Sequence, residues 1–321
     1  MIKERSTRTF ACRFINLNLI HTLKIAYHPI YVHPLPLGHR FPMLKYDLIP
    51  EQLLYEGVIA RTNLLAPEII NEDLILLTHE EDYWNRLRNL TLSAAEERRI
   101  GFKLSPRLIE REMRIAQGTI ETSLAALNAG VAFNVAGGTH HAGSNWGEGF
   151  CMLNDQAIAA RYLLHKDLAS RILIIDLDVH QGNGTAQIFK DDPRVFTFSM
   201  HGQKNFPFRK ETSDMDIGLE DGLEDEAYLT TLNANLTFAF ESFKPDFVFY
   251  LAGVDVLATD KLGKLALSKA AVKERDALVF NLCKSGNIPV QVSMGGGYSP
   301  RINDIVQAHC NTFKAAIQLY F

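Results

Sequence analysis

Residues 171–184 read Arg171-Ile-Leu-Ile-Ile-Asp176-Leu-Asp178-Val-His180-Gln-Gly-Asn183-Gly184, an apolar run that passes directly into polar and glycine residues. The run is almost continuously hydrophobic rather than alternating, which is typical of a strand covered on both faces. Asp178 and His180 are two positions apart, so on an extended segment their side chains point to the same side. The stretch therefore predicts a buried parallel strand that delivers polar groups at its carboxyl end.

Further apolar, β-rich runs occupy residues 23–27, 132–136, 195–199, 247–251 and 289–293. Helical patterns lie between these runs. One begins at the N-cap Ser105 with Pro106 in its first turn and ends at Gly130, and another begins at Ser268 and ends at Gly286. The alternation of strands and helices predicts an α/β fold with a mainly parallel central sheet. The highly charged residues 86–106 predict a surface excursion.

Composition excludes several classes of protein. The chain has 321 residues, of which 47% are hydrophobic and 22% charged, which argues against a disordered, collagenous or coiled-coil protein. The net charge of −4 carries no electrostatic signature of nucleic-acid binding. No apolar run approaches the roughly 18 residues that would span a bilayer, so we expect no membrane association.

Cysteine usage and the N-terminus bear on compartment and boundaries. The four cysteines at positions 12, 151, 283 and 310 form no CxxC pair, which argues against a disulfide framework and against a cysteine zinc site. We therefore expect a cytoplasmic protein. Secretion by a route that needs no signal peptide is the alternative. Residues 1–22 are interpreted as an N-terminal extension and residues 23–321 as the folded domain.

Four of the apolar runs end in residues that carry chemistry. Ligands of open parallel sheets bind beyond the carboxyl ends of the strands. At those positions the sequence has the pair His140-His141, the Asp-x-Asp-x-His of residues 176–180, Asp255, and Tyr298 after three glycines. Asp178, His180 and Asp255 are three ligands that leave a position open, as a catalytic zinc requires. Because residues 132–298 supply one constellation, a single domain is favoured over the two that length alone suggests.

Each feature also has an ordinary structural interpretation. A histidine beside an aspartate is often a buried structural pair, an Asp-x-Asp can cap a helix or form a calcium loop, and residues 295–297 can be a simple turn. The coincidence of four such features at the predicted active edge favours a functional site.

These motifs, in their order and spacing, resemble those of the zinc-dependent histone deacetylases and of their bacterial acetylpolyamine and acetoin-utilisation relatives. The matching stretches are Gly138-Thr-His140-His141-Ala, Gly149-Phe150-Cys151-Met-Leu-Asn154-Asp155, residues 176–184, Gly253-Val-Asp255 and residues 295–298. The sequences of these motifs are most similar to those of class IV of the family, and residues 39–43 resemble bacterial members. The resemblance covers about residues 24–320. It implies the arginase/deacetylase fold, a single three-layer αβα domain.

The resemblance implies a set of catalytic roles. His141 would be the general base that takes a proton from the attacking water and the acid that returns it to the leaving amine, with His140 as an electrostatic helper. Asp176 would hold the His140 ring and Asn183 would sit behind His141. Tyr298 would donate its O–H to the substrate carbonyl and to the oxyanion. Some classes have Asp where this chain has Asn183, so we expect a less basic imidazole here.

The resemblance also implies two cation sites. One Zn²⁺ would bind to Asp178, His180 and Asp255. A K⁺ ion would be surrounded by the Ser199 hydroxyl and by main-chain oxygens of Asp176, Asp178, His180 and Met200. A plain strand-end serine is the equal alternative for Ser199.

The sequence defines the substrate tunnel less clearly than it defines the metal site. Phe150 would form one aromatic wall, the Gly149 carbonyl would accept the substrate amide N–H, and Gly296 would line the tunnel. Residues 205–215 should form the opposite wall, but no facing aromatic is identifiable there, so we expect a wider tunnel that admits acyl groups bulkier than acetyl. Arg40 would reach an internal acetate-exit cavity, with a surface arginine as the equal alternative.

The expected function is zinc-dependent hydrolysis of acyl groups, acetyl or longer, from lysine side chains of proteins or peptides. One alternative is deacetylation of acylpolyamines or other small molecules, and another is a non-catalytic scaffold that binds acyl-lysine. A two-manganese ureohydrolase needs a further Asp where this chain has Gly182, which argues against that relative. The native substrate, the choice of Zn²⁺ or Fe²⁺, and the oligomeric state stay open.

Overall fold

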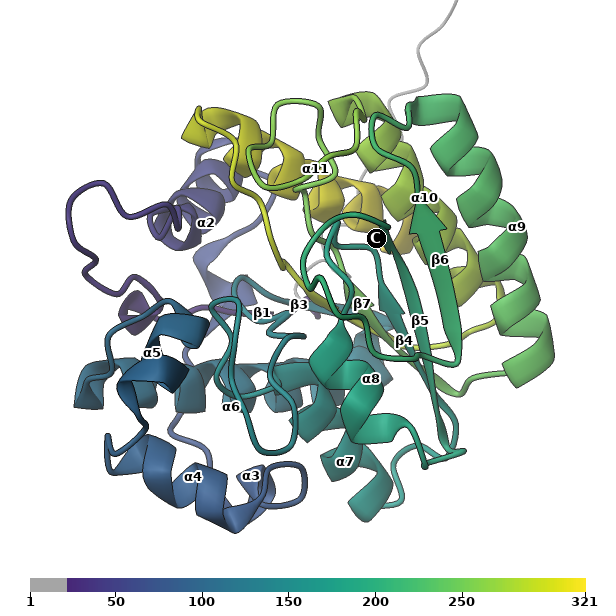
Figure 1. Ribbon diagram of the computed structural model, residues 1–321. Helices are drawn as coiled ribbons and strands as arrows, with labels where there is room; N and C mark the ends of the chain where they lie inside the picture. Colours follow the sequence, from purple (N-terminus) through teal and green to yellow (C-terminus); the bar gives the residue numbers. More distant parts are fainter. Residues whose placement is uncertain (1–21) are drawn as a thin grey trace, which may run out of the picture.

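The core of the molecule is an eight-stranded sheet in which every neighbouring pair of strands is parallel (Figure 1). The computed structural model describes residues 22–321. The strand order is β2-β1-β3-β8-β7-β4-β5-β6. The strands are β1 (Ile25–Ala26), β2 (Leu64–Leu65), β3 (Val131–Asn134), β4 (Ile172–Asp176), β5 (Val195–Gly202), β6 (Met215–Leu219), β7 (Phe247–Leu251) and β8 (Val290–Ser293).

Each of the six apolar runs predicted as strands overlaps an observed strand, which confirms the α/β assignment. Two strands at the edges of the sheet, β2 and β6, were not predicted. β2 has only two residues, and in β6 exposed and half-buried positions alternate before the buried Leu219, so neither forms a continuous apolar run. The predicted extension at residues 1–22 lies, apart from Thr22, outside the described residues.

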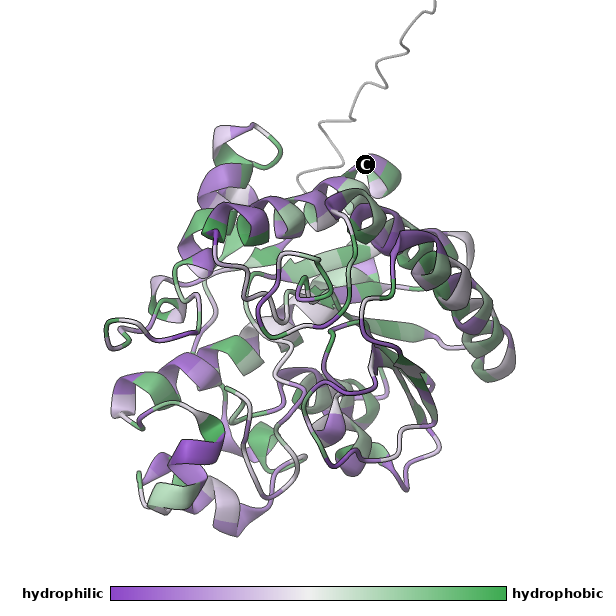
Figure 2. Cartoon of the chain, turned by 45° about the horizontal axis from the view of Figure 1, so that its top comes forward, coloured by the Kyte–Doolittle hydropathy of each residue, from purple (hydrophilic) through white to green (hydrophobic). Residues whose placement is uncertain are grey.

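Helices cover both faces of the sheet, which gives the expected three layers within one domain. One layer contains α2 (Lys45–Tyr55), α9 (Asp225–Phe243), α10 (Lys269–Ser285) and α11 (Ile302–Tyr320). The other contains α6 (Pro106–Ala129), α7 (Asp155–His165) and α8 (Asn183–Phe189). Short helices α3 (Glu72–Ile75), α4 (Glu81–Arg88) and α5 (Ala94–Ile100) and the 3₁₀ turns η1 (Pro29–Tyr31) and η2 (Arg61–Asn63) complete the fold. Figure 2 shows hydrophobic residues along the central strands and mixed hydropathy along the helices.

The predicted helix boundaries follow from local capping. Ser105 accepts a hydrogen bond from the Leu108 N–H at 3.2 Å, Pro106 opens α6, and Gly130 ends it with φ of +83°. Ser268 caps α10 in the same way, and Gly286 follows its last residue. Among residues 22–321, no helix combines the length and the apolar character needed to cross a bilayer.

A buried ion pair supports the loops that follow β4 and β7. Arg275 and Asp276 on α10 are fully buried, and their side chains lie 2.8 Å apart. Arg275 also donates to the carbonyls of Leu177, at 3.2 Å, and Gly253, at 2.6 Å. The guanidinium therefore ties together the two segments that carry the aspartates of the predicted metal site.

Candidate active site

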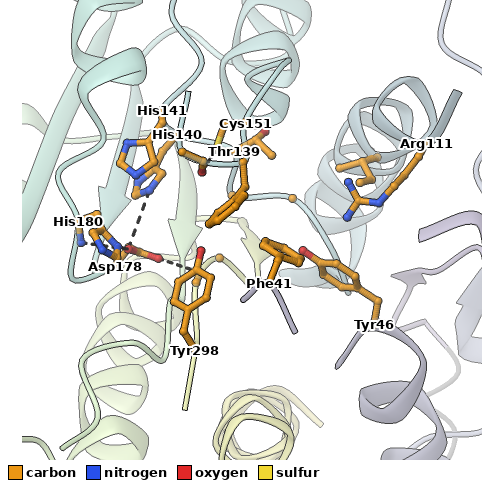
Figure 3. Close-up of a pocket in the computed structure, with 17 residues that line it drawn as sticks. Phe41, Tyr46, Arg111, Thr139, His140, His141, Cys151, Asp178, His180 and Tyr298 are labelled. Carbon is orange, nitrogen blue, oxygen red and sulfur yellow. Dashed lines mark hydrogen bonds and ion pairs between the residues drawn. The ribbon is translucent and has the colours of Figure 1, made fainter. Parts of the chain in front are cut away.

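Three buried side chains converge beyond the carboxyl ends of β4 and β7 (Figure 3). The Nδ1 atom of His180 lies 2.9 Å from Oδ1 of Asp178 and 3.1 Å from Oδ2 of Asp255. One ligand atom from each residue lies within 4.8 Å of the other two. Although Asp255 Oδ2 is buried, it receives no hydrogen bond. An orphaned carboxylate oxygen beside a ring nitrogen fits a metal ion, and these oxygen and nitrogen donors suit zinc.

The charges of this cluster also favour a cation. Burial opposes a charged His180 ring, but the nearby carboxylates of Asp178 and Asp255 outweigh burial and raise the pKa of His180 to about 10. Burial, followed by the charge of Asp178, raises the pKa of Asp255. The cluster therefore carries excess negative charge that either a proton or a divalent cation would neutralise.

Backbone groups hold the remaining carboxylate oxygens. The Gly296 N–H donates to Asp178 Oδ2 at 2.8 Å, and the Val179 N–H donates to Asp255 Oδ1 at 3.0 Å. A Cβ atom at position 296 would lie 2.1 Å from Asp255 Oδ2 and 2.6 Å from Asp178 Oδ2. Only glycine fits there, because the backbone approaches both carboxylates closely. Gly296, predicted as a tunnel residue, lies directly against the candidate ligands.

The paired histidines have different partners. His140 Nδ1 lies 2.6 Å from Asp176 Oδ2, whereas His141 Nδ1 lies 2.7 Å from the amide oxygen of Asn183. Burial disfavours the charged His140 ring, but Asp176 and Asp178 outweigh burial and raise its pKa. Burial, with the adjacent His140 and His180, lowers the pKa of His141 well below its ordinary value. One ring is thus suited to carry a proton and the other to accept one.

Tyr298 completes the cluster from the loop after β8. Its ring centroid is 6.3 Å from that of His180, and Figure 3 shows the hydroxyl directed toward the side of the pocket with Asp178. The Tyr298 N–H donates to Asp260 Oδ2 at 2.6 Å, a contact that the sequence reading missed. Burial raises the pKa of Tyr298 well above its ordinary value, so the hydroxyl keeps its proton.

Lys45 on α2 also supports this loop, and no sequence signal identified it. Its buried Nζ donates to the Gly295 carbonyl at 2.6 Å and lies 5.7 Å from the Phe41 ring and 5.3 Å from the Tyr46 ring. Burial lowers the pKa of Lys45 to about 8. The ammonium group thus fixes the turn that precedes Tyr298.

The opposite tunnel wall corrects the sequence reading. Phe206 lies within the stretch where no facing aromatic was identified, and its ring centroid is 5.0 Å from that of His141. It lines the entrance cavity together with Gly149 and Phe150. Phe206 and Phe208 look equivalent in sequence, but loop conformation leaves Phe208 89% exposed and half-buries Phe206. The stated reason for a wider tunnel, a missing aromatic, therefore does not hold.

The charged residues 86–106 are not a simple excursion. They contain helix α5, whose last residues hold the Phe150 wall: the Ile100 carbonyl accepts the Phe150 N–H at 2.7 Å, and the Arg99 carbonyl accepts the Gly149 N–H at 3.1 Å. Phe150 is held at φ of +71°, a strained conformation for a non-glycine residue. The Phe102 ring lies 5.2 Å from it.

Arg40 lies at the entrance rather than in the interior. Its guanidinium carbon is 5.2 Å from the Phe150 ring centroid, and it lines the entrance cavity. An inner cavity of about 40 Å³ is lined instead by Arg111, with Phe41, Tyr46 and Cys151. Arg111 places a charged side chain in the buried stripe of α6 between Leu108 and Ile115, and that charge was the signal that could have identified it.

The residues expected around a K⁺ ion are partly adjacent. Asp176 and Ser199 are partners in the register of β4 and β5, and Met200 follows directly. The Ser199 hydroxyl lies 2.9 Å from His201 Nδ1 and is engaged by that ring. This contact accounts for Ser199 without an ion, so the K⁺ site stays a prediction.

Comparison with known proteins identifies consistent similarities. The family model described as "Histone deacetylase domain" matches residues 39–313. The chain is 46% identical to an uncharacterised protein of Picosynechococcus sp. over 92% of this chain and 99% of that protein. It is 30% identical to Histone deacetylase 2 of Arabidopsis thaliana over 81% of this chain and 70% of the relative. The crystal structure of an HDAC homologue complexed with SAHA superposes with a TM-score of 0.80 at 26% identity, covering 92% of this chain and 84% of the other.

Proposed function

The chain belongs to the histone deacetylase family, and from this premise we propose that it is a zinc-dependent hydrolase that removes acyl groups from lysine side chains. It is a deacetylase-type hydrolase. The observation that carries the proposal is the convergence of Asp178, His180 and Asp255 with the Asn183-backed His141 at the boundary between an entrance cavity and an inner cavity. We assign this activity to residues 23–321. The sequence motifs of these residues are most similar to those of class IV of the family.

Asp178, His180 and Asp255 would hold the zinc ion. When bound, zinc would polarise the acyl carbonyl and make a coordinated water more acidic. The carbonyl of Gly149 and the rings of Phe150 and Phe206 would orient the acyl-lysine side chain, since all three residues line the entrance cavity.

His141 is proposed as the base. Its Nδ1 donates to the Asn183 oxygen, which leaves Nε2 as the free acceptor. His141 takes a proton from the attacking water and returns it to the amine that leaves. His140, held by Asp176, stays charged and stabilises negative charge near the reacting carbonyl.

Tyr298 is proposed to donate its O–H to the oxyanion. Asp260 and Lys45 would fix its loop through the Tyr298 N–H and the Gly295 carbonyl. A donor placed in advance at the site of developing charge is typically worth about 2.7–4 kcal/mol of transition-state stabilisation.

The metal and the reaction can be tested together. The purified protein should contain one zinc ion per chain and should hydrolyse a fluorogenic acetyl-lysine peptide. Asp255→Asn should abolish both, while Asp221→Asn, at an exposed carboxylate, should abolish neither. Bound zinc with no turnover on any acyl-lysine would contradict the proposed hydrolase activity and favour a non-catalytic scaffold that binds acyl-lysine.

Acyl length needs a separate experiment. We propose hydrolysis of acetyl-lysine, with acyl groups longer than acetyl as the extension. The test of this extension is to measure kcat/KM on acetyl-, octanoyl- and myristoyl-lysine peptides. A strict preference for acetyl would refute the extension.

A further inference from the structure

The entrance to the site carries an unusual set of charges. The entrance cavity has a volume of about 390 Å³ and is lined by Arg40, Arg99, Lys204 and Lys264. Among the described residues, no aspartate or glutamate lines it. These cations come from four separate segments: the loop before α2, the end of α5, the loop after β5 and the loop after β7. The whole chain is acidic, with a net charge of −4, so the positive entrance opposes the overall balance.

The carboxylates near these cations neutralise them only weakly. Lys204 lies 3.6 Å from Glu220 and Lys264 lies 3.9 Å from Asp221, in pairs whose side chains are all at least 39% exposed. Exposed pairs of this kind contribute only about 0–1 kcal/mol to stability, so a carboxylate of a bound peptide can compete for these lysines. Arg99 lies 3.9 Å from Glu148, which also accepts a hydrogen bond from Asn183 at 2.6 Å.

Arg40 is the most available of the four cations. It is exposed and forms no ion pair with any described residue, and its guanidinium lies over Phe150. It therefore lies beside the aromatic wall, exposed and without a carboxylate partner among the described residues. A guanidinium in that position can receive a carboxylate in a bidentate manner.

We propose that this entrance selects acyl-lysines that lie within acidic peptide sequences, with Arg40, Arg99, Lys204 and Lys264 as the specificity-determining residues. The inference rests on the proposed function and names its substrate class. An acyl-lysine is neutral, so the charge of its neighbours decides how the entrance interacts with a substrate. The same cations repel acylpolyamines and strongly basic tails. They also repel the lysine ammonium that forms on hydrolysis, which favours release of the product.

The test compares matched acetyl-lysine peptides that differ only in the flanking residues: four glutamates, four glutamines or four lysines, with acetylspermidine as a cationic small molecule. We expect kcat/KM to be at least about tenfold higher for the glutamate peptide than for the lysine peptide at 20 mM salt. The ratio should fall toward one at 0.5 M salt, because salt screens exposed charges. Arg40→Gln/Lys264→Gln should reduce the low-salt ratio to about threefold or less, because it removes two of the four cations that line the entrance.

The control is Lys166→Gln/Lys273→Gln, which removes two exposed cations from the end of α7 and from α10 and should keep the wild-type ratio. Equal kcat/KM for the two charged peptides, or a preference for the lysine peptide or acetylspermidine, would overturn the inference. If no peptide is hydrolysed, the proposed function has failed. Fluorescence anisotropy of the labelled peptides then decides the inference alone: tighter binding of the glutamate peptide supports it, and equal binding overturns it.

Discussion

The partner of His141 can be changed to test which ring acts as the base. In Asn183→Asp, a carboxylate replaces the amide oxygen that lies 2.7 Å from His141 Nδ1. The Asn183 amide also donates to Glu148 at 2.6 Å, so the single substitution would place two carboxylates in contact. Glu148→Gln removes that repulsion, and the double variant Asn183→Asp/Glu148→Gln is therefore the informative one.

The size of the effect follows from the geometry. Two unit charges about 4 Å apart interact with about 4 kcal/mol at an effective dielectric constant of 20. Each 1.36 kcal/mol is one pKa unit, so about three units is the ceiling, and an opposite charge at this range commonly shifts a pKa by about 1–3 units. In the wild type, burial and the neighbouring histidines keep the pKa of His141 low. A base with a low pKa stays unprotonated, and so active, down to acidic pH.

The new carboxylate favours the protonated ring, so activity should be lost at higher pH than in the wild type. The assay is the pH dependence of kcat/KM on an acetyl-lysine peptide, and we expect the acid limb to move upward by about 1–3 units. Glu148→Gln alone is the matched control and should move the acid limb of the pH profile much less. An acid limb that does not move, in a double variant with unchanged zinc content and Tm, would refute the assignment of His141 as the base.

Three further predictions concern the oxyanion donor, its loop and the buried ion pair. Tyr298→Phe should lower kcat by about 10²–10³-fold with unchanged zinc content, because it removes one hydrogen-bond donor to the oxyanion; a change of less than threefold would contradict that role. Lys45→Met should lower kcat about tenfold in the wild type but have little effect in the Tyr298→Phe background, because the effects of coupled residues are not additive. Equal losses in both backgrounds would show a general structural effect. The control is Lys314→Met, which breaks an ion pair at the end of α2. Asp276→Asn should lower the free energy of unfolding by about 3–5 kcal/mol, measured by urea denaturation, because it leaves Arg275 buried without its anion; an unchanged midpoint would contradict it.

The sequence was most informative where local pattern and chemistry coincide. The strand β4 is a continuous apolar run, and its polar end carries Asp178 and His180, so alternation and the sheet rule together predict which side chains meet. The same reasoning placed His140, His141, Asp255 and Tyr298 at one edge, and these residues do lie together. Family resemblance supplied the individual roles, which periodicity cannot provide.

What the sequence missed depends on contacts between distant segments. Phe206 faces His141 because of how its loop folds, and nothing local distinguishes it from Phe208. Lys45 reaches Gly295 across 250 positions of sequence, a distance that no pattern bridges. The positive entrance is likewise assembled from separate loops, and the acidic net charge of the chain conceals it.

The place of β8 within the sheet has a consequence for biosynthesis. This strand is the last of the eight in sequence, yet it lies between β3 and β7 and joins the three strands on one side to the four on the other. As the chain leaves the ribosome, those two groups therefore exist before the strand that unites them. Until residues 290–293 emerge, β3 and β7 each have an unpaired edge of the kind that invites aggregation. Since Tyr298 follows the same strand, a nascent chain has neither a continuous sheet nor all of its proposed catalytic residues until residue 298 has been made.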